Sequence, residues 1–293
     1  MPRLLESLSE YQKDSSEKFV FSNHGQSLEE WMMGFPYVAD PGKGILPLKE
    51  YIDVGLSNGV EYFIPPGEAE WQRHHQEWIH VRKSWFSSIG LTKDCLGEEV
   101  HPQDKLAHYA RACTDITYKF PFGEHELEGI AARGNFDLTQ HQEHSGKSLE
   151  YFDENLKEKY LPHVIEPSLG VDRTFLAVLC SAYSVDEIDG EKRTVLRFHP
   201  RVAPIKAGVF PLVKNKPELV EVAKKVYERL QRKWNVVYDQ SGAIGRRYRR
   251  IDEAGVPFGI TVDFESLEGD GSFTVRDRDS TEQVRMSEEE LLL

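Results

Sequence analysis

A carboxylate and a hydroxyl lie two residues apart in the segment Glu166-Pro167-Ser168-Leu169-Gly170. If this segment is extended, the side chains of Glu166 and Ser168 point to the same side of the backbone. Such a pair suits an ammonium group with polar neighbours, because the carboxylate supplies the opposite charge and the hydroxyl a hydrogen bond. The segment is therefore a candidate binding site for an amine.

An arginine follows this segment within the first turn of a helix predicted to begin at about Val171. A cation in that turn opposes the helix dipole and costs a few tenths of a kcal/mol, unless an anion shares the site. A helix N-terminus and a guanidinium together make a suitable phosphate seat. The structural alternative is an ion pair of Arg173 with Asp172 or Glu166.

A second candidate is the segment 122–129, in which Glu124, Glu126 and Glu128 alternate along the chain. These carboxylates suit magnesium or a ribose hydroxyl, although a solvated strand face explains them equally well. His141 and His144 are three residues apart with no evident third ligand, so we predict no metal site there. The chain lacks GxxxxGK[ST], GxGxxG and GxSxG, which removes the familiar nucleotide loops and the hydrolase elbow.

Basic residues gather near the C-terminal end of the chain. Four arginines and a tyrosine occupy barely two helical turns: Arg246, Arg247, Tyr248, Arg249 and Arg250. Arginine beside an aromatic ring suits phosphates and unstacked bases, as in the recognition of single-stranded RNA loops. Because Asp252 and Glu253 follow closely, internal salt bridges are the alternative.

The basic segment is not apparent from the net charge of the whole chain, which is negative. The 293 residues have a net charge of −13, whereas residues 201–260 hold 13 Lys and Arg against 6 Asp and Glu. This asymmetry indicates a basic module attached to an acidic body. No apolar run has the length of a membrane span or signal peptide, and the three cysteines are far apart, so we expect a cytoplasmic protein without disulfides.

Apolar spacing predicts the elements that position these residues. We expect helices over 68–89 and 104–112, strands over 116–120, 127–131 and 160–166, and a helix from about Val171. In the first helix, Trp71, Trp78 and Trp85 are seven residues apart, with His75, Val81 and Phe86 near the same stripe; this indicates a buried face. The first 55 residues have no sustained periodicity and stay unassigned.

The remainder of the chain alternates strands and helices after a boundary expected near Pro200. Strands are predicted over 205–213, 236–238, 258–264 and 272–276, and helices over 217–234 and 244–251. This order favours a mostly parallel sheet with helices on its faces. The chain as a whole is therefore of the α/β (α+β) class, with two domains.

From about Val60 to Met286 the sequence resembles the glycyl-tRNA synthetases of the homodimeric, class II type. The matching stretches are DKLAHYARACTDITYKFPFGEHELEGIAARGNFDLTQHQEHSGKSLEYFD, HVIEPSLGVDRTFLAVLCSAY, VLRFHPRVAPIKAGVFPL and SGAIGRRYRRIDEAGVPFGITVDFESLEGDGSFTVRDRDSTEQVRM. The resemblance implies a partial class II catalytic domain built on an antiparallel sheet over 56–200 and an α/β anticodon-binding domain over 201–293. It further implies activation of glycine by ATP, with Mg²⁺, and transfer of glycine to tRNA(Gly).

The resemblance also implies roles for individual residues. The family's EPSxG segment lies at the amino-acid pocket, which places Glu166, Pro167, Ser168, Leu169 and Gly170 around glycine. Its third class II motif supplies an arginine to the ATP phosphates, here Arg173, which we expect to be catalytic. The implied ATP-binding set is Glu126, Leu127, Gly170, Val171, Asp172 and Arg173, and the expected tRNA-binding set is Arg246, Arg247, Arg249 and Arg250.

The family's first and second class II motifs are not recognisable here. Gly59 aligns with a glutamate that the family places near the glycine ammonium, and Arg3 is the only arginine before Arg73. We therefore expect poor aminoacylation by this chain alone, because electrostatic stabilisation is usually the largest catalytic contribution. The expected partners are a second copy of the chain or a separate chain that supplies motifs 1 and 2. The alternative is a non-catalytic paralogue that acts as a tRNA-binding module.

Overall fold

The computed structural model describes residues 37–40, 44–47, 57–188, 190–269 and 271–292. Most of the unassigned segment 1–55 therefore lies outside the described residues. Within it, β1 (Tyr37–Asp40) and β2 (Gly44–Pro47) pair as an antiparallel hairpin. Contacts divide the chain into one compact unit within 35–180 and a second that contains 181–293. The boundary between the two units lies before Ser181, about 20 residues ahead of the boundary expected near Pro200. The expected domains 56–200 and 201–293 stay a prediction.

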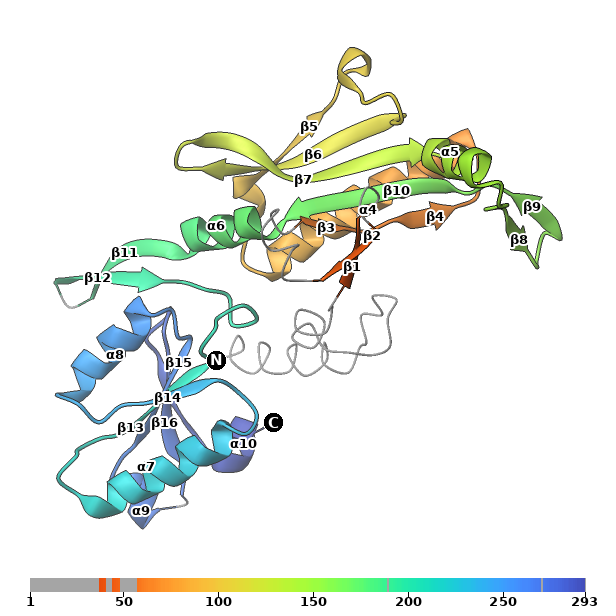
Figure 1. The fold of residues 1–293 in the computed structure, drawn as a ribbon. Helices are drawn as coiled ribbons and strands as arrows, with labels where there is room; N and C mark the ends of the chain where they lie inside the picture. The colour runs from red at the N-terminus through yellow and green to blue at the C-terminus, as the bar shows by residue number, and fades with distance from the viewer. Residues whose placement is uncertain (1–36, 41–43, 48–56, 189, 270, 293) are drawn as a thin grey trace. The chain divides into compact units, whose positions relative to one another are not determined.

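An antiparallel sheet forms the centre of the first unit (Figure 1). Its strand order is β3-β10-β7-β6-β5, and β4 also pairs with β10. The bounds are β3 Ser57–Gly59, β4 Tyr62–Ile64, β5 Leu96–Val100, β6 Ala112–Phe120, β7 Gly123–Gly134 and β10 His163–Gly170. The expected antiparallel catalytic-type sheet is confirmed. Strand β10 extends through the EPSLG segment, beyond the predicted strand end at Glu166, because β7 pairs with it as far as Leu169.

Helix α4 (Glu68–Ser88) packs against one face of this sheet, where it contacts β7 and β10. The predicted buried stripe is only partly correct. His75, Ile79 and Phe86 are buried, whereas Val81 is 51% exposed and the tryptophans are half-buried. The buried face thus follows His75, Ile79, Arg82 and Phe86, and it includes an arginine because Arg82 pairs with the buried Glu128 of β7 at 2.7 Å.

The helix predicted over 104–112 is wrong. The segment contains only the 3-10 turn η2 (Gln103–Lys105), and β6 already begins at Ala112. The end of this segment pairs with the sheet instead of forming a helix, since the Arg111 N–H donates to the Ala132 carbonyl at 2.7 Å. Three further elements were not predicted from the sequence: η1 (Lys93–Cys95), α5 (Phe136–Ser145), and the hairpin of β8 (Tyr151–Asp153) and β9 (Glu158–Tyr160).

The second unit contains a five-stranded mixed sheet of order β14-β13-β15-β16-β17. The expected mostly parallel sheet is correct only for the first three strands in this order, because β16 and β17 are antiparallel to their neighbours. The strand bounds are β13 Ala207–Pro211, β14 Val236–Tyr238, β15 Phe258–Val262, β16 Phe273–Asp277 and β17 Gln283–Met286.

Two helices cover opposite faces of this sheet, α7 (Pro217–Leu230) and α8 (Ile244–Glu253) (Figure 1). Leu219, Ala223 and Val226 of α7 join one apolar core, whereas Ile251 of α8 packs with Phe210 in another. The hairpin of β11 (Tyr183–Ile188) and β12 (Glu191–Leu196) contacts α8, and the short helices α9 (Glu265–Glu268) and α10 (Glu288–Leu292) complete the unit. None of the helices among the described residues is both long and apolar enough to cross a membrane.

Candidate functional site

The pairing of β6, β7 and β10 shows which side chains share a face of the first sheet. Glu128 of β7 reaches Arg82 on α4, so its neighbour Gly129 points to the face opposite α4. Directly paired residues lie on the same face, and this places two rows there: Asp115-Gly129-Ser168-Gly59 and Cys113-Ala131-Glu166. We call the residues of these two rows the site face. Because Gly129 and Ala131 are small, its centre is open between the polar side chains of β6 and β10.

Glu166 occupies the β10 end of the second row and accepts a hydrogen bond from Arg133 through Oε2. Arg133 also donates to Asp137 at 2.8 Å and stacks 4.1 Å from the Tyr109 ring centre. Burial alone would lower the pKa of Arg133, but hydrogen bonds to Asp137 and Glu166 raise it above its ordinary value. The guanidinium therefore stays charged and fixes one carboxylate oxygen of Glu166.

The other oxygen of Glu166 faces β3. A Cβ atom placed on Gly59 would lie 3.9 Å from Glu166 Oε1, and Ser168 is paired with Gly59 in the same row. Glu166 and Ser168 thus lie on the same face of β10, as their spacing predicted. Gly59, at the position where the resembling family has a glutamate, leaves room next to Oε1.

Arg173 lies in the first turn of α6 (Val171–Ala182). Its Nη1 donates to the Glu126 carbonyl at 2.9 Å and lies 3.8 Å from Glu126 Oε2. Neither of the partners considered from the sequence, Asp172 or Glu166, receives a described hydrogen bond from it. Both side chains, Arg173 and Glu126, are 52% exposed, so the guanidinium retains donors for a ligand.

The remaining residues of the two expected binding sets differ in burial. Asp172 is exposed, whereas Leu169, Gly170 and Val171 are half-buried and Pro167 is buried. Leu127 is 1% exposed and its side chain belongs to the core, so only its backbone is available to ATP, and its place in the ATP-binding set stays a prediction. The strand contains an irregularity at this point, because β6 pairs Ile116 with Glu128 but Thr117 with Glu126. Leu127 is the extra residue, which shifts the alternation that the sequence predicted.

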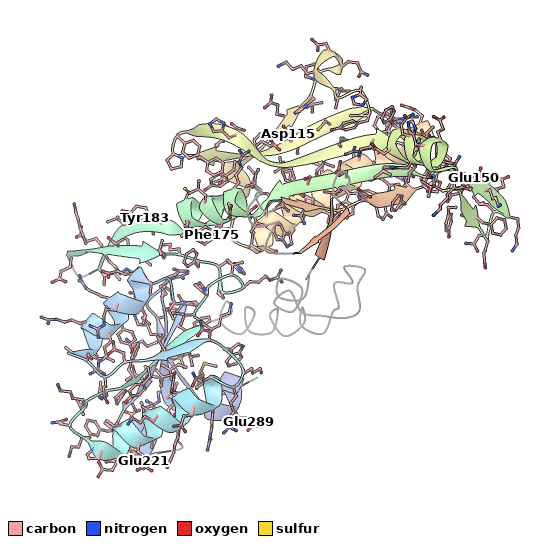
Figure 2. All side chains as sticks on the ribbon, viewed as in Figure 1. Asp115, Glu150, Phe175, Tyr183, Glu221 and Glu289 are labelled. Carbon is pink, nitrogen blue, oxygen red and sulfur yellow. The ribbon has the colours of Figure 1, made fainter. Side chains whose placement is uncertain are left out.

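A cluster of side chains at β6 and the end of β5 was not predicted from the sequence. His101, Cys113 and Asp115 each offer a ligand atom within 4.8 Å of the other two, and Figure 2 labels Asp115 on the sheet. Burial raises the pKa of the Cys113 thiol to about 12, and the carboxylates of Asp115, Glu126 and Glu166 contribute. The alternation of Cys113 and Asp115 on a predicted strand was an available signal. His101 was not, because β5, which it follows, has no clear apolar pattern.

The four arginines expected to bind tRNA have different environments on α8. Arg247 is 1% exposed and donates to the backbone carbonyls of Pro211 and Gly242, so its assignment to a tRNA-contacting surface is corrected to a structural role. Arg249 pairs with Glu191 and Arg250 with Asp239, as the internal salt-bridge alternative proposed, although with other partners. Arg246 is exposed and has no ion-pair partner among the described residues.

Comparison with known proteins agrees with both units. A family model described as an anticodon binding domain matches residues 206–292. Glycine--tRNA ligases from Staphylococcus aureus strains JH9, Newman and N315 are each 47% identical to this chain over 254 residues, which is 86% of this chain and 52% of each relative. The chain is therefore a glycyl-tRNA synthetase-like protein with an anticodon-binding domain, and it spans about half the length of the curated relatives it matches.

Proposed function

We propose that this chain supplies the amino-acid pocket and the tRNA-binding part of a glycine–tRNA ligase, which activates glycine with ATP and transfers it to tRNA(Gly). The observation that supports this most directly is the arrangement of Glu166 and Ser168 on the site face, with Glu166 Oε1 next to Gly59. The names of the similar proteins support the reaction and the amino acid.

The site face suits the ammonium group of glycine. Arg133 occupies only Glu166 Oε2, which leaves Oε1 as the charged acceptor, and the Ser168 hydroxyl is a second hydrogen-bonding group on the same strand. The open centre at Gly129 and Ala131 gives room for the small substrate. We therefore assign ammonium binding to Glu166 and Ser168, and the positioning of Glu166 to Arg133.

ATP would lie at the start of α6. The exposed guanidinium of Arg173 and the N-terminal N–H groups of this helix favour the phosphates. The Glu126 carboxylate, 3.8 Å from Arg173, offers the hard oxygen ligand that Mg²⁺ takes together with substrate phosphates. Bound Mg²⁺ would supply neutralisation of charge on the phosphates. In the proposed reaction the glycine carboxylate oxygen attacks the α-phosphorus, and the bond from the α-phosphorus to the departing pyrophosphate breaks.

We further propose that the 293-residue chain by itself aminoacylates poorly. Residues 4–72 contain no arginine, and Gly59 provides no carboxylate. Loss of one electrostatic donor costs ~10²–10³ in rate, and here two groups are replaced. A separate chain that contains motifs 1 and 2 would restore the reaction.

Glycine binding and glycine-dependent ATP–pyrophosphate exchange test this proposal. We expect the purified chain to bind glycine and ATP but to exchange slowly, and Glu166→Gln to weaken glycine binding while the exposed Glu143→Gln has no effect. Absence of glycine binding to the folded chain would refute the assigned pocket. Fast exchange by the chain alone would instead refute its dependence on a partner.

A non-catalytic tRNA-binding module is the second candidate. The replacement at Gly59 favours it, because this glycine faces the carboxylate on which the amino-acid pocket depends. This candidate predicts that the chain binds tRNA but neither glycine nor ATP, and that addition of a chain containing motifs 1 and 2 restores no exchange.

A further inference from the structure

Three side chains with nitrogen, sulfur and oxygen donors converge beside the proposed amino-acid pocket. Cys113 and Asp115 alternate on β6 and so share the site face. His101 directly follows β5, and its N–H donates to the Cys113 carbonyl at 3.0 Å, which holds it next to β6. From this arrangement we infer that His101, Cys113 and Asp115 form a binding site for a zinc ion.

The distances between the donor atoms suit a common metal ion. His101 Nε2 lies 2.8 Å from Asp115 Oδ2, and Cys113 Sγ lies 3.8 Å from Asp115 Oδ1. Bonds of about 2.3 Å from zinc to sulfur and about 2.1 Å to nitrogen or oxygen require ligand atoms about 3.5 Å apart in a tetrahedron. The two observed separations lie on both sides of this value and run to different oxygens of Asp115, so a common ion requires rotation of the His101 and Asp115 side chains.

The donor set selects the class of metal. Thiolate, imidazole and carboxylate together are typical ligands of zinc, whereas magnesium and calcium prefer oxygen alone. A structural hydrogen-bonded pair of His101 and Asp115 has no need of the thiol. Three protein ligands leave the fourth tetrahedral position to water, as in zinc sites that are open to solvent.

The charges around the cluster also favour a divalent cation. A Cβ atom on Gly129 would lie 3.4 Å from Asp115 Oδ1 and 3.6 Å from Glu126 Oε1, so these two carboxylates flank the same glycine. On binding, the zinc–sulfur bond forms as the Cys113 thiol loses its proton to water. His101 exchanges its hydrogen bond with Asp115 for the metal and binds as the neutral ring.

Cobalt(II) reports this site directly, because a thiolate ligand gives charge-transfer absorption in the near ultraviolet. We expect the reduced full chain to develop this band with one equivalent of Co²⁺ and to lose it on addition of Zn²⁺. Cys113→Ser should abolish the band. Cys95→Ser and Cys180→Ser are matched controls that should retain it, since both cysteines lie outside the cluster.

A second variant guards against misfolding of Cys113→Ser. His101→Gln alters a residue outside the regular strands and should weaken Zn²⁺ binding more than about 100-fold, because even outer-shell partners account for 10–100-fold. Near-ultraviolet circular dichroism checks that both variants fold. A cobalt band that persists in Cys113→Ser, or unchanged zinc affinity in folded His101→Gln, would overturn the inference. The assay contains no glycine, ATP or tRNA, so its outcome is independent of the proposed function.

Discussion

Two arginine–carboxylate groups, one in each unit, have opposite surroundings. In the first unit, Arg173 and Glu126 are each 52% exposed and their charged atoms are 3.8 Å apart. In the second unit, Arg193 and Arg276 both reach Asp252 at 2.9 Å, and all three side chains are at least nine-tenths buried. A buried guanidinium that shares a carboxylate with another element holds the fold together, whereas an exposed one with a single hydrogen bond remains available to a ligand.

The buried pairs join elements that are distant in sequence. Arg193 lies on β12, Asp252 on α8 and Arg276 on β16, and Arg193 also donates to Asp186 and to the Arg278 carbonyl. We call Arg193, Asp252 and Arg276 the buried arginine network. It fixes the β11–β12 hairpin to the anticodon-binding unit, which accounts for the division of contacts before Ser181.

Asp252→Asn is expected to have the largest effect, because it leaves two buried guanidinium groups without their shared charge. Breaking a buried ion pair by removal of one partner costs ~3–5 kcal/mol. Urea unfolding of the variant should show a loss of this size in the free energy of unfolding.

The neighbouring Glu253 is exposed and provides the matched control for Asp252. Glu253→Gln should change the free energy of unfolding by less than about 0.5 kcal/mol. If the two variants are equally stable, the buried arginine network does not hold the hairpin, and the comparison between the units fails.

Arg173→Ala tests the opposite side of the comparison. It should weaken ATP binding about 10–100-fold, because hydrogen bonds to charged groups contribute ~1.5–3 kcal/mol, and leave the unfolding transition unchanged. Arg73→Ala is matched in exposure, at 51%, and in having carboxylate partners, Glu70 and Glu77. ATP affinity measured by equilibrium dialysis should not change in Arg73→Ala, and equal losses in both variants would contradict a phosphate site at α6.

The sequence was informative where one strand or helix sets the geometry. The shared face of Glu166 and Ser168 requires only an extended segment, and the start of α6 needed only its local pattern. Arg133 was missed because its role depends on the pairing of β7 with β10, and no local spacing reveals which strands are neighbours. His101 was missed for the same reason, because it lies next to Cys113 only through the pairing of β5 with β6.

The arginines of α8 show what helical spacing adds to composition. Composition alone placed all of them on one RNA-binding surface, yet helical spacing puts Arg247 on the same face as Ile244 and Ile251. Both isoleucines belong to or pack against the apolar cluster under α8. The pattern thus contained the signal that Arg247 is buried, but burial of an arginine depends on the carbonyl groups that receive it, and those come from other segments.

Arg246→Ala and Arg247→Ala should therefore separate RNA binding from stability. We expect Arg246→Ala to weaken tRNA binding several-fold and to reduce the slope of log affinity against log salt by about one, without a change in unfolding.

Arg247→Ala leaves backbone carbonyls without a donor and should lower the free energy of unfolding by ~1–3 kcal/mol. Filter binding at several salt concentrations and urea unfolding distinguish the two, and a salt slope unchanged in Arg246→Ala would exclude a phosphate contact there.

The smallest expected effect concerns a buried histidine that holds α4 on the sheet. Burial lowers the pKa of His75, and its neutral Nε2–H donates to the Ile130 carbonyl at 2.9 Å. The unfolded chain therefore takes up a proton near pH 6.5 that the folded one resists, so stability present above that pH falls as the pH drops below it. The loss amounts to at most about 1.4 kcal/mol per pH unit. His75→Gln keeps an amide donor and cannot titrate, so its unfolding free energy should depend less on pH between 7.5 and 5.5 than that of the unsubstituted chain. The control His80→Gln alters an exposed histidine and should show the same pH dependence as the unsubstituted chain. Equal pH dependence in all three proteins would show that His75 is not held neutral.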